Sequence, residues 1–159
     1  MTAERLAARV KRALASARDR SDAVRVAVEA VHDWSDRYDW TGVYLLETEG
    51  ALVLSHFIGA PTPHTRIPLS MGICGAAARE KQTLIVPDVQ ADPRYLSCSL
   101  ATRSEIVVPI IKDGSVYGEI DIDSHKPDAF GAADREELEQ VAALLADHLA
   151  GPGRSEVSH

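Results

Sequence analysis

The segment Gly118–Ser124 constrains the fold more than any other part of this chain. Its residues alternate between apolar and acidic, so a β-strand here places two isoleucines on one face and Glu119, Asp121 and Asp123 on the other. Carboxylates two positions apart on one face stand only about 7 Å apart and repel each other. The pattern allows two interpretations: an exposed acidic edge strand that discourages aggregation, or part of a polar ligand pocket.

Cys98 has the neighbours of a reactive thiol rather than of a packing residue. It stands between Ser97 and Ser99, after Asp92-Pro93 and just before a strand-like run that opens with Glu105. A cysteine kept for packing usually has apolar neighbours. We therefore interpret Cys98 as a working thiol, with a chance loop cysteine as the alternative.

Composition narrows the function classes. The chain has 159 residues, 45% of them apolar, which suits one core and one domain. Its 17 Lys and Arg against 24 Asp and Glu give a net charge of −7, which disfavours nucleic-acid and anionic membrane partners and favours a small molecule. The two cysteines and six histidines show no metal-ligand spacing, so we expect no metal and no cofactor.

The sequence predicts a cytoplasmic protein. No apolar run approaches the length of a membrane span, and the N-terminus lacks the hydrophobic core of a secretory signal. Two cysteines are too few for a disulfide scaffold, which fits a reducing compartment. The Arg- and Ala-rich opening also has a faint likeness to an organelle transit peptide, although it fits an amphipathic helix equally well.

Hydrophobic periodicity predicts an α+β domain with an antiparallel sheet. Helical spacing appears near both ends of the chain, and strand-like runs fill the middle, interrupted by a short small-residue helix that opens at Gly72. We expect helices packed on one face of the sheet and a ligand pocket under loops on the other. The expected parts are helices over about 2–37, a sheet core over about 41–123, a helix over about 132–150, all in one domain of residues 1–150, and an unstructured tail over 151–159.

Cys74 stands in Gly72-Ile73-Cys74-Gly75, near the predicted start of that short helix. A helix N-terminus lowers the pKa of a thiol through its dipole and free amides, so Cys74 could be reactive. A small residue at this position could equally serve close packing of the helix on the sheet. The pattern leaves both interpretations open.

Six motifs follow one another along the chain: Trp40-Thr41-Gly42-Val43-Tyr44-Leu45, Gly72-Ile73-Cys74-Gly75, Asp88-Val89, Cys98, Ser104-Glu105-Ile106-Val107-Val108-Pro109 and the segment Gly118–Ser124. Together, these motifs resemble the GAF domain of the free methionine-(R)-sulfoxide reductase family. The likeness runs from about residue 21 to about residue 149, and the order of the motifs is more specific than any one of them. It implies a thiol-dependent oxidoreductase that converts free L-methionine (R)-S-oxide to L-methionine.

The resemblance assigns roles to the thiol and the acidic residues. Cys98 matches the nucleophile, which would become a sulfenic acid, while Glu105, Asp121 and Asp123 match carboxylates that hold the free amino acid and assist proton transfer. Carboxylates suit a free α-ammonium group, which a methionine residue inside a protein lacks, so the same charges favour the free amino acid as substrate.

Trp40 and Tyr44 match aromatic residues that surround the methyl-sulfur end of the substrate. They stand four positions apart, so a strand places them on one face. Their pattern alone favours core packing, and only the resemblance favours the pocket.

One position departs from the family. A third cysteine, which often stands ten positions before Cys74 and resolves the oxidised nucleophile, is replaced here by His64. An imidazole cannot close a disulfide, so oxidised Cys98 must be recycled by Cys74, by a low-molecular-weight thiol or by a thioredoxin-like reductant. We predict Cys74 as the resolving thiol, because it is the other thiol of the chain and a helix N-terminus favours thiolate.

The resemblance also implies a homodimer formed through the N-terminal and C-terminal helices. Two rival functions remain at this point. One is a GAF sensor that binds a small molecule without turnover, and the other is a peroxide-reducing thiol protein.

Glu105 joins the paired aspartates only if the register of its strand allows it. A two-residue turn at Asp113-Gly114 would place Glu105 on the opposite face. We therefore predict a three-residue turn that pairs Ile111 with Ser115 and, further along the ladder, Glu105 with Asp121, unless another bulge restores the parity.

Overall fold

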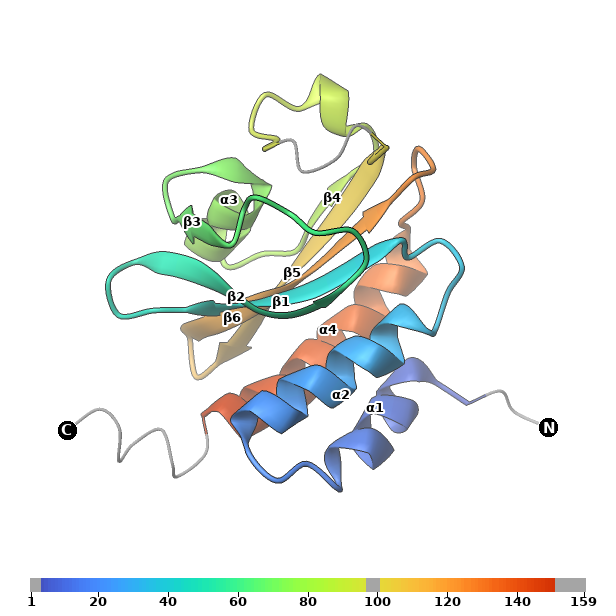
Figure 1. Ribbon diagram of the computed structural model, residues 1–159, viewed down its shortest axis with the longest axis vertical. Coiled ribbons are helices and arrows are strands. Elements are labelled where there is room, and N and C mark those ends of the chain that lie inside the picture. The colour runs from blue at the N-terminus through green and yellow to red at the C-terminus, as the bar shows by residue number, and fades with distance from the viewer. Residues whose placement is uncertain (1–3, 97–100, 151–159) are drawn as a thin grey trace.

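The computed structural model describes residues 4–96 and 101–150, so Cys98 and the tail 151–159 lie outside the described residues. Six antiparallel strands form one sheet in the order β3-β2-β1-β6-β5-β4, with helices on both faces (Figure 1). The elements are α1 (Leu6–Leu14), α2 (Arg20–His32), β1 (Trp40–Leu46), β2 (Ala51–Ile58), β3 (Arg66–Pro68), α3 (Gly72–Glu80), β4 (Leu84–Val86), a 3-10 turn (Val89–Ala91), β5 (Ser104–Lys112), β6 (Ser115–Ser124) and α4 (Ala132–Leu149).

Helices α1, α2 and α4 form a layer against one face of the sheet (Figure 1). Every second residue of the central strands points into this layer, and Ile106, Ile120 and Ile122 are at most 1% exposed there. Burying apolar side chains of this size stabilises the fold by about 1.5–3 kcal/mol each. The predicted α+β architecture with an antiparallel sheet is confirmed.

Helix α3 lies on the opposite face, where it contacts β5 and β6, so the expectation that the helices share one face is wrong for this element. Its residues Ile73–Ala78 are all buried. At Gly75, a Cβ atom would lie 2.7 Å from the carbonyl oxygen of Leu69, so only glycine permits this close approach. The predicted pocket side of the sheet is therefore covered by a helix as well as by loops.

The turn between β5 and β6 differs from the prediction. Lys112 pairs with Ser115, and Asp113 and Gly114 both have positive φ, as a two-residue type I′ turn requires. A bulge then shifts the register between Ile110 and Ile111, which restores the parity. The three-residue turn and the pairing of Glu105 with Asp121 were thus wrong.

The shared face of the three carboxylates is confirmed. Glu105 lies directly opposite Asp123, and residues directly opposite in an antiparallel pair point to the same side. Strand β6 lies between β1 and β5, and Asp121 and Asp123 are only 3% exposed. The exposed acidic edge is therefore excluded, because β6 is a central strand with buried carboxyl groups.

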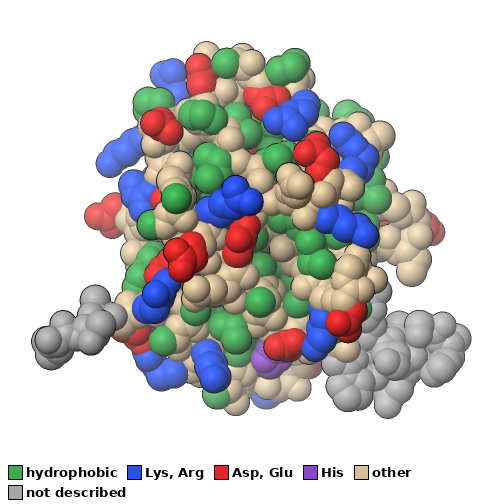
Figure 2. All heavy atoms as spheres, turned by 180° about the vertical axis from the view of Figure 1, so that it is seen from behind, with side chains coloured by type: hydrophobic (Ala, Val, Ile, Leu, Met, Phe, Trp, Pro, Cys, Tyr) green, Lys and Arg blue, Asp and Glu red, His purple; other side chains and the backbone are tan. Residues whose placement is uncertain are grey.

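The surface carries mixed charge. Figure 2 shows basic and acidic side chains interspersed over the face it displays, and ion pairs such as Arg66 with Glu47 and Lys112 with Asp147 join residues of opposite sign. Among the described residues, no helix has the length and apolar character needed to cross a membrane.

Candidate active site

Three cross-strand rows gather the acidic residues on the α3 side of the sheet. Each row takes one residue from β1, one from β6 and one from β5, and directly opposed residues share a face. The rows are Trp40, Asp123 and Glu105; Gly42, Asp121 and Val107; and Tyr44, Glu119 and Pro109.

Four carboxyl groups are buried in these rows. Glu105, Glu119, Asp121 and Asp123 are at most 4% exposed. No lysine or arginine of residues 4–96 and 101–150 is buried with them. A buried carboxylate is costly unless it is paired, so this environment favours either protonated carboxyl groups or a cationic ligand.

Cys74 connects α3 to this cluster. Its thiol donates a hydrogen bond to Asp121 Oδ2 at an Sγ–Oδ2 distance of 3.5 Å. The thiol has one proton, so the neighbouring Glu119 carboxyl is left with no hydrogen-bond partner on either oxygen among the described residues. One oxygen of Asp121 and one of Asp123 are likewise buried and unpartnered there.

Burial raises the pKa of all three acidic residues of β6. The pKa of Glu119 lies well above its ordinary value, and the contact with Cys74 offsets only part of the effect of burial. Burial and the charge of Asp121 also raise the pKa of Asp123 well above its ordinary value, against a hydrogen bond with Glu105. The pKa of Asp121 is raised by burial too, opposed by hydrogen bonds from Glu105 and Cys74. The site therefore favours the protonated form of these carboxyl groups more than water does.

Cys74 does stand at the N-terminal end of α3, but the expected lowering of its pKa is wrong. Burial, together with the negative charges of Asp121, Glu119 and Glu105, raises the pKa of the thiol well above its ordinary value. Desolvation and the adjacent carboxyl groups thus outweigh the helix dipole, whose effect is small by comparison.

Trp40 forms an aromatic wall beside Asp123. Its indole stacks on Phe57 with ring centroids 5.7 Å apart, and Nε1 donates a hydrogen bond to the carbonyl oxygen of Ala60 at 2.9 Å. A Cβ atom at Gly42 would overlap the indole ring. Glycine at this position therefore lets the ring lie across the strand.

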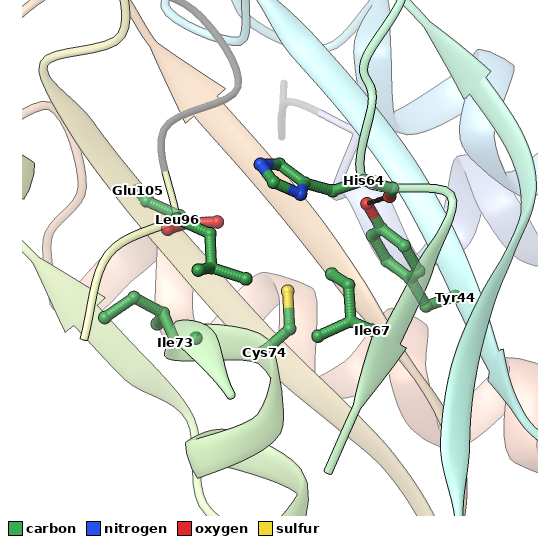
Figure 3. Close-up of a pocket in the computed structure, with 8 residues that line it drawn as sticks. Tyr44, His64, Ile67, Ile73, Cys74, Leu96 and Glu105 are labelled. Carbon is green, nitrogen blue, oxygen red and sulfur yellow. Dashed lines mark hydrogen bonds between the residues drawn. The ribbon is translucent and has the colours of Figure 1, made fainter. Parts of the chain in front are cut away.

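Tyr44 forms the opposite side of the site. Its hydroxyl donates a hydrogen bond to the carbonyl oxygen of His64 at 2.7 Å, which ties the loop before β3 to β1. Figure 3 shows Cys74 pointing into the pocket between Ile67 and Leu96, with the His64 ring beyond it. The cavity holds only about 20 Å³, room for about one water molecule.

The structure thus brings together five of the predicted site residues. Cys74 and the three carboxylates meet beneath α3, with Trp40 at the end of the same face. Tyr44 lies on the same face and lines the pocket, and both Trp40 and Tyr44 also belong to the apolar core around α3. The predicted nucleophile, Cys98, lies outside the described residues.

Comparison with known proteins identifies the family. The GAF domain family matches residues 17–150. The chain is 37% identical over 112 residues to the free methionine-R-sulfoxide reductase of Escherichia coli, a match that covers 70% of this chain and 67% of that protein. The chain belongs to the free methionine-R-sulfoxide reductase family of GAF domains.

Two further members of this family are similar. The free methionine-R-sulfoxide reductase of Saccharomyces cerevisiae is 42% identical to this chain over 110 residues. The match covers 67% of this chain and 61% of the yeast protein, so the chain spans less than two thirds of that relative. The structure of the free methionine-R-sulfoxide reductase from Neisseria meningitidis in complex with its substrate superposes with a TM-score of 0.85 at 30% identity, covering 98% of this chain and 96% of that one.

In this GAF domain, two residues have roles in the site that the sequence did not predict. Glu119 was placed on the acidic face by its alternation with Ile120, yet only the structure shows that it lies fully buried against Cys74. Gly42 was part of a motif, but its role in admitting the Trp40 ring depends on a side-chain conformation that no sequence pattern specifies.

Proposed function

We propose that the chain reduces free L-methionine (R)-S-oxide to L-methionine with Cys98 as nucleophile. The observation that carries this proposal is the buried cluster of four carboxyl groups beside the Trp40 indole. In this cluster, oxygens of Glu119, Asp121 and Asp123 have no hydrogen-bond partner among the described residues. An ammonium group supplies the missing positive charge, and the indole offers an apolar surface to the methyl and sulfur. The family membership supports the same reaction.

Substrate binding uses the ionised members of the cluster. A free amino acid presents its α-ammonium group to Glu105 and Asp121, which are close together beneath α3. The cavity of about 20 Å³ is too small for an amino acid, so binding requires the residues that line it to move apart.

Asp123 is the proton donor that we propose for the chemical step. Burial and the neighbouring Asp121 keep the pKa of Asp123 high, and it lies beside Trp40 at the edge of the site. The Cys98 thiolate attacks the sulfoxide sulfur, which forms an S–S bond, while Asp123 gives its proton to the oxygen. The hydroxyl oxygen then becomes bonded to the Cys98 sulfur as the S–O bond of the substrate and the new S–S bond both break. The products are methionine and Cys98 sulfenic acid.

Recycling then requires an external thiol. The reason given for Cys74 as resolving thiol does not hold, because the pKa of this thiol is raised rather than lowered and the side chain is only 5% exposed. We therefore propose that a low-molecular-weight thiol or a thioredoxin-like protein attacks the Cys98 sulfenic acid, releasing water and forming a mixed disulfide. A second thiol then restores Cys98.

The decisive test is reduction of racemic free methionine sulfoxide with dithiothreitol, with the two epimers separated by chromatography. We expect the R epimer to be consumed, the S epimer to remain, and the Cys98→Ser variant to be inactive. An unreacted R epimer with folded protein would refute the reductase function. Calorimetric binding of methionine, its sulfoxide or cyclic nucleotides without turnover would then favour the GAF sensor, and turnover of hydrogen peroxide would favour a peroxidase.

A blocked substrate tests the role of the carboxylates. N-acetylmethionine sulfoxide keeps the reacting sulfoxide but lacks the ammonium charge. We expect its kcat/KM to fall at least about 100-fold, the size of effect that an unpaired buried group can cause. Equal rates for the free and blocked substrates would show that the cluster does not bind the ammonium group.

We also propose a homodimer through the N-terminal and C-terminal helices. Light scattering would give twice the chain mass if this is correct, and the mass of one chain would rule it out.

A further inference from the structure

The side chains of Cys74, Glu105 and Asp121 converge on one point beneath α3 from three different elements. One sulfur or oxygen atom from each lies within 4.8 Å of the corresponding atoms of the other two. All three side chains are at most 5% exposed. Each becomes an anionic metal ligand when it loses its proton.

The spacing of these atoms fits tetrahedral coordination. Zinc bonds of about 2.3 Å to sulfur and about 2.0 Å to oxygen place the two ligand atoms about 3.5 Å apart. Cys74 Sγ and Asp121 Oδ2 are separated by 3.5 Å. A shift of about 1 Å at the end of the Glu105 side chain would complete three ligands around one ion.

Two further observations favour a positively charged ligand at this site. Both oxygens of Glu119 and one oxygen of Asp121 are buried with no hydrogen-bond partner among the described residues, and Glu119 contacts the Cys74 thiol. The adjoining cavity, lined by Cys74 and Glu105, holds about 20 Å³, which suits one water molecule or ion rather than a larger ligand.

We propose that Cys74, Glu105 and Asp121 form a binding site for one Zn²⁺ ion, with a water molecule from the cavity in the fourth position. A thiolate with two carboxylates favours zinc over Mg²⁺ or Ca²⁺, which prefer six or more oxygen ligands. Binding releases the thiol proton to solvent.

Zinc and the free amino acid would exclude each other, because Glu105 and Asp121 serve both. This second part rests on the proposed reductase function. Zinc would thus act as a reversible inhibitor that competes with the α-ammonium group of the substrate for the same carboxylates.

Cobalt titration of the untagged, reduced full-length chain tests the metal site without an activity measurement. Co²⁺ replaces Zn²⁺ in such sites, and a thiolate ligand produces a charge-transfer band in the near ultraviolet that nitrogen and oxygen ligands do not. We expect one Co²⁺ per chain with this band, its retention in Cys98→Ser, and its loss in Cys74→Ala. The affinity for Zn²⁺, measured by displacement of Co²⁺, should fall in Cys74→Ala by more than the roughly 10–100-fold typical of losing a second-shell partner.

Asp121→Asn is a second variant, for use if Cys74→Ala does not fold. It should keep the thiolate–cobalt charge-transfer band and bind zinc at least about tenfold more weakly. A band that survives in Cys74→Ala, disappears in Cys98→Ser or never forms would overturn the site. Free methionine sulfoxide should displace the ion. If cobalt binds as expected but the sulfoxide does not displace it, the shared use of Glu105 and Asp121 is refuted and the metal site stands.

Discussion

Replacing Glu119 by glutamine should change how the stability of this protein depends on pH. Glu119 is fully buried, and both of its oxygens lack a hydrogen-bond partner among the described residues. Burial raises the pKa of its carboxyl well above the ordinary value of 4.5. The native state therefore keeps this proton over a pH range in which the unfolded chain releases it.

The sign of the effect follows from proton linkage. Above about pH 4.3, the unfolded state binds fewer protons than the native state, so the free energy of unfolding falls as pH rises. One such group lowers it by up to about 1.4 kcal/mol per pH unit, until the pH passes the native pKa. Glutamine has nearly the same shape and no proton to lose, so Glu119→Gln should lack this component.

Urea unfolding at half-unit steps between about pH 5 and about pH 7 measures the slope, provided that the m-values of the two proteins agree. Asp121 and Asp123 contribute to the slope in both proteins, so the difference isolates Glu119. The control is Glu136→Gln on α4, where the side chain is 68% exposed, and its curve should run parallel to that of the wild type.

Parallel curves for wild type and Glu119→Gln would refute the reasoning. They would mean that Glu119 is ionised or exposed to water in the native state. The carboxyl cluster beneath α3 would then not be shielded from solvent.

Three further predictions concern catalysis. Asp123→Asn should lower kcat roughly 10²–10⁴-fold, the usual contribution of a general acid, and a rate within threefold of wild type would exclude Asp123 from that role. Gly42→Ala should push the Trp40 indole aside and lower the free energy of unfolding in urea by about 1–3 kcal/mol. It should also raise the KM for the free sulfoxide more than it lowers kcat. An unchanged KM would show that the ring does not contact the substrate. In a single turnover without reductant, intact-mass analysis should find Cys98 sulfenic acid and no internal disulfide, in both wild type and Cys74→Ser, whereas a Cys98–Cys74 disulfide in wild type would restore Cys74 as the resolving thiol.

Much of the acidic face could be predicted because strand alternation is a local property. The order of residues 118–124 alone assigns Ile120 and Ile122 to one face and the carboxyl groups to the other, whatever the rest of the chain does. The antiparallel α+β architecture follows from the same kind of local periodicity. The reaction was predicted from the family motifs, because their order can be read from the sequence without knowledge of the tertiary structure.

The register of β5 on β6 was decided by non-local pairing. Asp113-Gly114 adopts the two-residue turn that its composition favours, and the parity is recovered only by a bulge near Ile110. A bulge depends on how neighbouring strands twist and pack, so no short sequence pattern marks it.

The environment of Cys74 shows the same limit more sharply. Its helix position predicts an acidic thiol, but α3 presses it against carboxyl groups from β5 and β6 that stand 31 and 47 positions further along the chain. Desolvation and like charge reverse the direction of the pKa shift, and both depend on distances in space. The chain sequence therefore specifies which groups are available, while the packing of α3 on the sheet determines which of them hold protons and which can share a cation.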